Sequence, residues 1–272
     1  MTNLPADATT PTPYPEVNRV LARLLRDART VLGDHLVGLY LDGSLTSGDF
    51  DDASDIDFVA ATDAEADETL FADLQAMHDR IAATGWPWSD QLEGSYVSLA
   101  VLRRHDPAHE NHPNIERGKG ERLKIASHGA DWDIHRFVVR ERGIPLAGPD
   151  PKTLIDPVSP ESLRRSSSQY LHWWLATFLD DPVKIADGGY QSYTVLSVCR
   201  ILYTLEFGTV ASKAEAVRWG KETLGARWGP LIDRAWETRR HPPKEAPPAE
   251  VAATQDFIRF ALERVLPADH FA

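Results

Sequence analysis

Two kinds of apolar pattern divide this chain, and that division restricts its possible folds more than any other feature. Before residue 148, short β-rich runs alternate with helical patterns. After Ser159-Pro160, a pair typical of a helix start, apolar residues recur at helical spacing almost throughout. Strands followed by helices favour an α+β domain joined to an all-helical bundle. The turn-forming residues 148–151 and 156–157 mark the boundary, so we predict domains at 1–157 and 158–272.

The first domain is expected to be a small mixed sheet backed by helices. Apolar residues at helical spacing predict helices over 16–32 and 65–83. Apolar β-rich runs predict strands at 36–41, from Asp55, and from Glu93 through the β-rich stretch 96–102. In the second domain we expect helices at about 160–180, 190–207, 213–224, 229–240 and 249–265.

Asp55 and Asp57 are the main candidates for chemistry. They belong to the strand-like run Asp55-Ile56-Asp57-Phe58, and alternate residues of a strand point to the same face. Two adjacent carboxylates repel each other, and a divalent cation between them removes the conflict. We therefore predict that Asp55 and Asp57 hold a divalent metal ion.

Gly43-Ser44 follows the apolar run 36–41 directly, at the exit of a predicted strand. A small turn there lets backbone N–H groups and a hydroxyl approach a phosphate closely. A phosphate cradle beside a metal-binding carboxylate pair suits phosphoryl or nucleotidyl transfer.

Gly43-Ser44, a spacer of about ten residues, and Asp55-Ile56-Asp57 together resemble the signature of the nucleotidyltransferase superfamily. Within it, Leu92-Glu93, the segment 198–208 (Val-Cys-Arg-Ile-Leu-Tyr-Thr-Leu-Glu-Phe-Gly) and the segment 212–219 (Ser-Lys-Ala-Glu-Ala-Val-Arg-Trp) resemble the streptomycin/spectinomycin adenylyltransferases. The resemblance implies an N-terminal nucleotidyltransferase domain, a C-terminal helical domain, ATP as co-substrate and Mg²⁺.

The resemblance also implies a third carboxylate, and Glu93 is the candidate. Glu93 stands at the start of the predicted strand, where it would take the proton from an attacking hydroxyl. Its other interpretation is an ordinary carboxylate at a strand edge. Ser44 and Ser54 would contact phosphate or a metal-bound water.

Arg200 and Lys213 are the candidates for binding the nucleotide in the second half. Arg200 lies in a helix that is apolar nearly all round, and a buried guanidinium needs an anionic partner. Glu206 or another acid would serve, and so would a phosphate. Ser212 and Glu215 form a capping pattern that makes Lys213 open a helix, where anions are favoured. The resemblance assigns both cations to ATP phosphates; an exposed structural lysine is the other interpretation of Lys213.

The candidates for acceptor binding are aromatic and acidic. An aromatic face with a carboxylate suits an amine- or guanidinium-bearing sugar, and the resemblance implies a tryptophan and an aspartate in this role. Each tryptophan has packing as its other interpretation. The residues are Trp132, Trp173, Trp174, Asp180, Asp181 and Asp187.

Residues 103–130 are rich in arginine, lysine and histidine. They could form a basic lid over a triphosphate or a solvated connecting loop, and we expect the loop.

Composition limits the possible partners. The chain has 41 acidic and 29 basic residues and a formal net charge of −12, which argues against nucleic acid as the main substrate and suits a cationic small molecule. The single cysteine, Cys199, lies in an apolar run and is expected to be a buried thiol. We expect no signal peptide, no membrane span, a monomer and a cytoplasmic location.

The sequence therefore predicts an ATP-dependent enzyme that transfers AMP to a hydroxyl of a small cationic acceptor. An aminoglycoside such as streptomycin or spectinomycin is the favoured acceptor, which would make antibiotic resistance the role. One alternative is a nucleotidyltransferase that acts on a protein or another metabolite. Another is an inert nucleotide-binding regulatory module.

Overall fold

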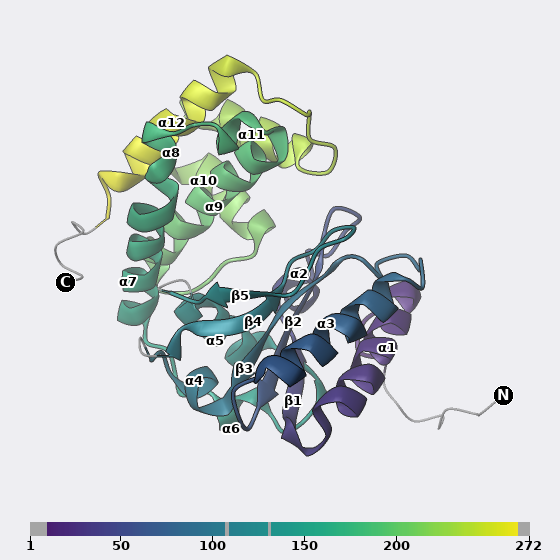
Figure 1. Cartoon of the computed structure of the whole chain (residues 1–272). Coiled ribbons are helices and arrows are strands. Elements are labelled where there is room, and N and C mark those ends of the chain that lie inside the picture. The colour runs from purple at the N-terminus through teal and green to yellow at the C-terminus, as the bar shows by residue number, and fades with distance from the viewer. Residues whose placement is uncertain (1–9, 107–108, 130–131, 266–272) are drawn as a thin grey trace. The chain divides into compact units, whose positions relative to one another are not determined.

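The structure, a computed structural model, describes residues 10–106, 109–129 and 132–265 (Figure 1). Its contacts separate two compact units. The first, here the sheet unit, contains the chain up to Gly48, Asp55–Ser127 and Val139–Asp156. The second, here the helical unit, contains Asp49–Ser54, His128–Val138 and the chain from Pro157. Two short segments that precede residue 157 thus belong to the helical unit, and the domain boundary after residue 157 stays a prediction.

The sheet unit is built on a mixed six-stranded sheet with the order β5-β4-β3-β2-β1-β6. β2 and β3 run parallel, and the other neighbouring strands pair antiparallel. The expectation of mixed α/β structure with a small mixed sheet is confirmed. The strands are β1 (Leu36–Leu41), β2 (Ile56–Thr62), β3 (Leu92–Ser98), β4 (Asn111–Ile115), β5 (Lys124–Ser127) and β6 (Ile144–Ala147).

Helices α1 (Pro15–Leu32) and α3 (Glu68–Ala82) lie side by side across the sheet (Figure 1). The apolar positions of α1 recur every three or four residues, so one stripe of the helix is fully buried. α1 ends at Gly33, whose φ of +54° favours glycine. α3 connects the parallel strands β2 and β3, as a parallel pair requires. The remaining helices are α2 (Gly43–Ser47), α4 (Leu99–Arg103), α5 (Trp132–Arg142), which crosses the border between the units, and α6 (Pro151–Leu154).

The segment 103–130 is not the loop that we expected. Its described part contains β4 and β5, which form an antiparallel pair at the edge of the sheet. Histidine, proline and asparagine dominate β4, so the sequence lacks the alternation of β-branched residues that reveals a strand. His112 and Pro113 are nevertheless buried in it. The prediction of a solvated loop is therefore wrong for these strands.

Two smaller differences concern chain turns. The run that follows β3 was expected to continue as a strand to Leu102, but it turns into α4 after Ser98. Gly43-Ser44 opens the short helix α2 instead of a simple turn.

From Pro157 to residue 265 the chain is helical, as the apolar periodicity predicted. α9 passes through the core of the unit and is buried on nearly every side. A helix of this kind must be apolar all round. The elements are α7 (Pro160–Tyr170), the π-helical turn η3 (Leu171–Leu175), α8 (Thr177–Asp180), η4 (Lys184–Ala186), α9 (Gly188–Phe207), α10 (Lys213–Thr223), α11 (Gly229–Thr238) and α12 (Pro248–Leu262).

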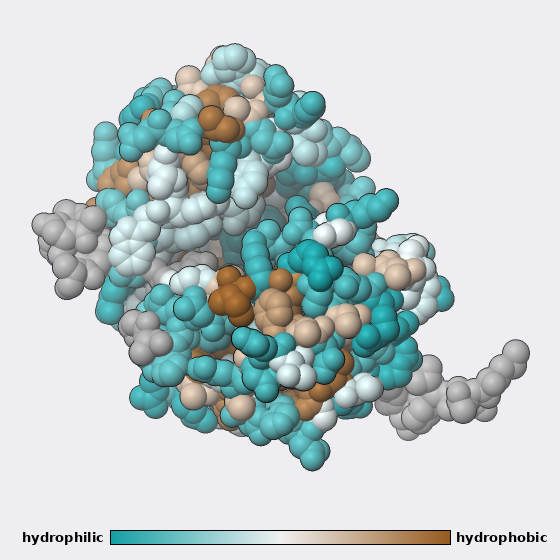
Figure 2. Space-filling model, in the orientation of Figure 1, coloured by the Kyte–Doolittle hydropathy of each residue, from teal (hydrophilic) through white to brown (hydrophobic). Residues whose placement is uncertain are grey.

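Cys199 lies on α9 and is fully buried, as expected. Burial raises the pKa of its thiol to about 12, so the thiol stays protonated and unreactive. Among the helices that the structure describes, none combines the length and apolar character that a membrane span requires. The face of the molecule in Figure 2 is mostly hydrophilic, and its apolar residues form small separate patches.

Candidate active site

Three carboxylates meet at one end of the parallel strand pair. Asp57 lies opposite Glu93 in the register of β2 and β3, and Asp55 immediately precedes β2. One carboxylate oxygen from each of the three lies within 4.8 Å of the others, and all three residues are half-buried. The structure thus brings together the three acidic residues that the sequence singled out.

This group fits a hard divalent cation. Three carboxylates in such proximity repel one another unless a positive charge lies between them. Mg²⁺ prefers oxygen ligands and is commonly held by one or two carboxylates together with substrate phosphates. Asp55, Asp57 and Glu93 supply such oxygens on an accessible surface.

Gly43 lies directly against this group. Its φ is +62°, and a Cβ atom added there would stand 1.8 Å from Oδ2 of Asp57. The backbone N–H of Asp42 donates to the carbonyl of Asp57 at 3.0 Å, and the Asp42 carboxylate accepts from the N–H of Gly43 at 2.6 Å. The Gly-Ser motif is therefore fixed against the strand that carries Asp57, and any side chain at residue 43 would displace that carboxylate.

The hydroxyl of Ser44 is buried and has no hydrogen-bond partner among the described residues. Buried polar groups are nearly always hydrogen-bonded. The Ser44 hydroxyl, one residue from Gly43, therefore has its hydrogen-bonding capacity available for a ligand oxygen.

A positive charge also faces the carboxylates. The guanidinium of Arg117 lies 3.4 Å from Oδ2 of Asp55. The loop that carries Arg117 joins β4 to β5, and backbone contacts anchor it: the N–H of Gly118 donates to Asp90 O at 2.7 Å, and the N–H of Leu123 donates to Gln75 Oε1 at 2.7 Å. From the sequence, Arg117 was only one of the basic residues of the segment 103–130, because the strands on either side of it have no clear strand pattern.

Ser54 lies in the helical unit. Its hydroxyl accepts from the N–H of Asp51 at 3.0 Å and donates to the Asp51 carboxylate at 3.2 Å. In this structure Ser54 orders the chain in front of Asp55.

Arg200 lies in the middle of α9 and is half-buried. Its Nε is buried and has no hydrogen-bond partner among the described residues. The alternative of a pairing with Glu206 is not seen, since Glu206 is exposed and has no described ion pair with Arg200.

Lys213 is the first residue of α10, as predicted. The hydroxyl of Ser212 accepts from the N–H of Glu215 at 3.1 Å, which confirms the expected cap. The next N–H, that of Ala214, donates to the carboxylate of Asp49 at 3.1 Å.

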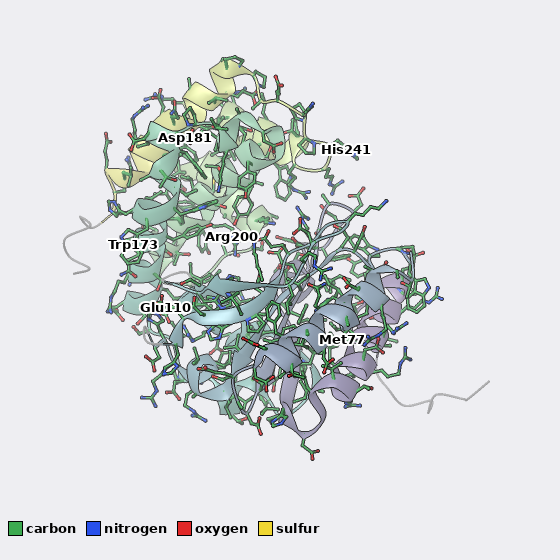
Figure 3. All side chains as sticks on the ribbon, in the orientation of Figure 1. Met77, Glu110, Trp173, Asp181, Arg200 and His241 are labelled. Atoms are coloured by element: carbon green, nitrogen blue, oxygen red, sulfur yellow. The ribbon has the colours of Figure 1, made fainter. Side chains whose placement is uncertain are left out.

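The candidates for acceptor binding occupy different kinds of environment. Trp132 is only 4% exposed and stacks on His128 with ring centroids 4.2 Å apart, as a packing residue does. Trp173 is 57% exposed, and Trp174 stacks on Tyr170. Figure 3 shows Trp173, Asp181 and Arg200 at three separate places on the helical unit.

The acidic candidates make local contacts. Asp187 caps α9 by accepting from the N–H of Tyr190 at 2.9 Å. Asp181 accepts from the N–H of Val183 at 3.1 Å, and Asp180 is the last residue of α8. Helix capping and local turns are therefore sufficient to explain these aspartates, and no ligand is needed to account for them.

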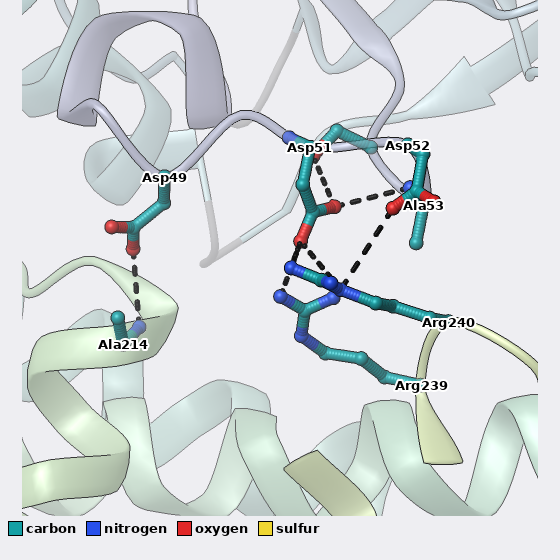
Figure 4. A network of polar contacts seen from close by, with 8 residues as sticks. Asp49, Asp51, Asp52, Ala53, Ala214, Arg239 and Arg240 are labelled. Carbon is teal, nitrogen blue, oxygen red and sulfur yellow. Dashed lines mark hydrogen bonds and ion pairs between the residues drawn. The ribbon is translucent and has the colours of Figure 1, made fainter. Parts of the chain in front are cut away.

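One polar network was not predicted. Asp49 and Asp51 accept hydrogen bonds from Ala214, Arg239 and Arg240 of the helical unit (Figure 4). The available signal was the acidic run 49–52 and the adjacent arginines 239–240, but sequence alone does not pair them.

The mixed sheet presents grouped carboxylates beside a Gly-Ser motif, and a solved structure shares the fold. A spectinomycin adenyltransferase from Enterococcus faecialis, determined with ATP and spectinomycin, superposes with a TM-score of 0.70 at 15% identity, covering 90% of this chain and 98% of that one.

The sequence comparisons give the particular group. Residues 153–264 match the family described as aminoglycoside adenylyltransferase, C-terminal domain. The chain is 27% identical over 227 residues to an aminoglycoside (3'')(9) adenylyltransferase from Shigella flexneri, covering 80% of this chain and 83% of the relative. It is 23% identical over 232 residues to a spectinomycin 9-adenylyltransferase from Campylobacter jejuni, covering 82% and 83%. Aminoglycoside and spectinomycin adenylyltransferases are therefore the proteins that this chain resembles over most of its length, and the match to the family is confined to residues 153–264.

Proposed function

We propose that this protein transfers AMP from ATP to a hydroxyl of a small cationic acceptor, with an aminoglycoside such as spectinomycin or streptomycin as the favoured substrate. The observation that carries the proposal is the convergence of Asp55, Asp57 and Glu93 within 4.8 Å beside the Gly-Ser motif. The similarity to aminoglycoside and spectinomycin adenylyltransferases supports the acceptor class.

Asp55 and Asp57 would hold Mg²⁺ in this proposal. The bound cation would supply positive charge where the triphosphate becomes more negative during transfer. The fit rests on the oxygen donors of the group and on Gly43, whose missing side chain leaves Asp57 in place.

Glu93 would act as the general base. It would accept the proton of the acceptor hydroxyl as the hydroxyl oxygen forms its bond to the α-phosphorus. The bond from that phosphorus to the bridging oxygen would break, and pyrophosphate would leave. The pairing of Glu93 with Asp57 in the strand register supports this role, because the two carboxylates belong to one group.

Four further groups would bind the nucleotide. The unpaired hydroxyl of Ser44 would donate to a phosphate oxygen, and Ser54 would contact a phosphate or a metal-bound water. Arg200 and Lys213 would balance the charge of the leaving pyrophosphate. For Arg200, the buried Nε without a described partner supports this role over structural pairing.

For the acceptor, exposed Trp173 and its neighbour Trp174 remain proposed contacts, with Asp187 as the carboxylate. An aromatic face attracts a cationic sugar, and the net charge of −12 favours such a ligand. Trp132 is buried, so its part would be to support the site by packing.

We further propose that residues 1–157 act as the nucleotidyltransferase domain and residues 158–272 as the helical domain of a monomer. A cytoplasmic location would follow from the use of ATP, and resistance to an aminoglycoside would follow from modification of its hydroxyl.

The test is pyrophosphate release from ATP and Mg²⁺ with streptomycin, spectinomycin, kanamycin or gentamicin, and with no acceptor as the control. The expected result is release that one of the first two stimulates. ATP binding without stimulation by any of the four would move the proposal to a protein or another metabolite as acceptor. Release by none of them and no magnesium-dependent ATP turnover would favour an inert regulatory module.

A further inference from the structure

The segment between Gly43-Ser44 and Asp55-Ile56-Asp57 does not belong to the same unit as these two motifs. Residues 49–54, here called the spacer, connect α2 to the start of β2. The spacer belongs to the helical unit, whereas Gly48 before it and Asp55 after it belong to the sheet unit. The chain therefore passes to the helical unit and returns within six residues, immediately before the first carboxylate of the site.

One anchor of the spacer is an ion-pair cluster centred on Asp51 (Figure 4). Oδ2 of Asp51 accepts from Nη2 of Arg239 at 2.5 Å and lies 3.0 Å from Nη2 of Arg240. The side chains of Asp51 and Arg239 are only 16% and 14% exposed. Ion pairs shielded from water in this way are screened less by salt than surface pairs.

The same carboxylate orders the spacer itself. Oδ1 of Asp51 accepts from the N–H of Ala53 at 3.1 Å and from the hydroxyl of Ser54 at 3.2 Å. Burial by itself would raise the pKa of Asp51, but the hydrogen bonds from Arg239, Ala53 and Arg240 and the charge of Arg239 outweigh it, so the pKa lies below its usual range. Asp51 therefore stays ionised. Its carboxylate pairs with both arginines and also accepts the hydrogen bond from Ser54, the residue before Asp55.

A second anchor lies at the other end of the spacer. Oδ2 of Asp49 accepts from the N–H of Ala214, in the first turn of α10. The first N–H groups of a helix have no partner within it, so a carboxylate there is stabilising. Two points of the helical unit thus hold the six-residue spacer.

We propose that Asp51 and Arg239 are positioning residues for the transfer reaction. By holding the spacer in one conformation, they fix the course of the chain that leads into Asp55, because only three residues separate Asp51 from Asp55. This inference rests on the proposed function, since Asp55 matters only if the carboxylate group performs chemistry. Small errors in the position of a reacting group are costly, as a misplacement of about 1 Å can reduce a rate roughly 100-fold.

The first experiment measures the anchor without reference to activity. Hydrogen exchange of the full-length protein would be followed by mass spectrometry in peptides that cover residues 49–54, for the wild type and for Arg239→Gln. We expect exchange there to become about tenfold faster, because the variant loses the ionic hydrogen bond to Asp51.

The helical unit offers a matched control. Arg227 also pairs with an aspartate, Asp256 at 3.2 Å, and also lies over a tryptophan ring, as Arg239 does, but its side chain is 70% exposed. Arg227→Gln should leave exchange in the spacer unchanged. Equal exchange in wild type and Arg239→Gln would overturn the proposed anchor.

The second experiment measures kcat and KM for ATP in Asp51→Asn, Arg239→Gln and the double variant. Each single variant should lower kcat about tenfold and move the KM for ATP less than threefold. Residues that act as a pair are not additive, so the double variant should be no slower than the slower single variant. Additive losses, a change in KM alone, or an unchanged kcat would each overturn the positioning role.

The wild type separates the two hypotheses. If it releases no pyrophosphate with any aminoglycoside, the proposed function fails, and the exchange experiment still decides whether Asp51 and Arg239 hold the spacer. If the wild type transfers AMP and the variants match it, only the positioning role fails.

Discussion

The sheet unit and the helical unit place their candidate residues in different ways. In the sheet unit, the parallel register of β2 and β3 puts Asp57 opposite Glu93, and Gly43 lies against the same carboxylate. In the helical unit, Trp132 is buried, Asp187 caps a helix, and Arg200 and Trp173 lie at separate places. Between paired strands, the spacing of residues in the sequence determines which side chains lie together. Between separate helices, it does not, because their contacts depend on how the helices pack.

This contrast predicts that the largest losses of activity come from the sheet unit. Asp57→Asn removes one charged ligand of the proposed metal site and should lower the transfer rate by roughly 1,000-fold, since a bound metal supplies several kcal/mol. Pyrophosphate release with Mg²⁺-ATP and spectinomycin measures it. Asp63→Asn, at the far end of β2 and paired with His35, is the control that should transfer normally. A slow Asp63 variant would point to misfolding of the strand.

Glu93→Gln should lower kcat by about 100-fold or more while the affinity for ATP stays within threefold, because the amide keeps the shape of the side chain but cannot accept the proton. Single-turnover transfer and equilibrium binding of ATP measure the two quantities separately. Glu116→Gln changes a carboxylate that follows β4 and pairs with Lys124 of β5, and this variant should transfer AMP normally. Normal transfer by the Glu93 variant would remove this residue as the base.

Gly43→Ala tests whether the close approach of the glycine to Asp57 matters. The added Cβ would stand 1.8 Å from the carboxylate oxygen, so Asp57 must move, and we expect about a 100-fold loss of kcat. Gly48→Ala is matched in backbone strain, with a φ of +79°, but has nothing within 4 Å of its Cβ. That control should lose about 1 kcal/mol of stability and keep its activity. Equal losses of kcat in both variants would show that strain, and not the carboxylate, is responsible.

Lys213→Ala probes the helical side of the comparison and should have a smaller effect. Loss of one charge-assisted contact with phosphate corresponds to about 1.5 kcal/mol, which is roughly a tenfold rise in the KM for ATP, with kcat nearly unchanged. Steady-state kinetics with varied ATP measure it. Lys221→Ala, on the same helix and paired with Asp233, should leave the KM unchanged. A larger effect on kcat than that of Glu93→Gln would reverse the comparison.

His78 should affect stability alone. It is buried between α3 and β3, its Nε2 lies 2.8 Å from the hydroxyl of Tyr96, and burial lowers its pKa from 6.5 to about 4. Between these values the unfolded chain binds more protons than the folded protein. Stability is therefore complete above pH 6.5 and falls as the pH drops toward 4, by about 3 kcal/mol in all. Urea unfolding from pH 7 to 5 should show the decline in the wild type and a weaker one in His78→Gln. The same decline in both would exclude His78 as its cause.

The elements of the fold that were predictable are those with strong local patterns. α1, β1, β2 and α9 are strongly apolar at the spacing of their structure, and their sequences identified them. β4 and β5 were missed because their residues are mainly polar and their pairing is non-local. In the same way, strand alternation paired Asp55 with Asp57, and the family resemblance added Glu93. The approach of Arg117 to Asp55 depended on a hairpin that the sequence did not reveal.

The return of the chain through residues 49–54 has a consequence for how such proteins can be recombined. The family match begins at residue 153, yet part of the helical unit comes from near the start of the chain. A helical module exchanged by one crossover near Pro157 would bring Arg239 and Arg240 without the aspartate that receives them, leaving two neighbouring positive charges with no counter-charge from the spacer. An exchange of helical modules between relatives would therefore work only when the recipient's spacer carries an acidic residue that can pair with the donor's arginines. The two distant segments would then have to change together.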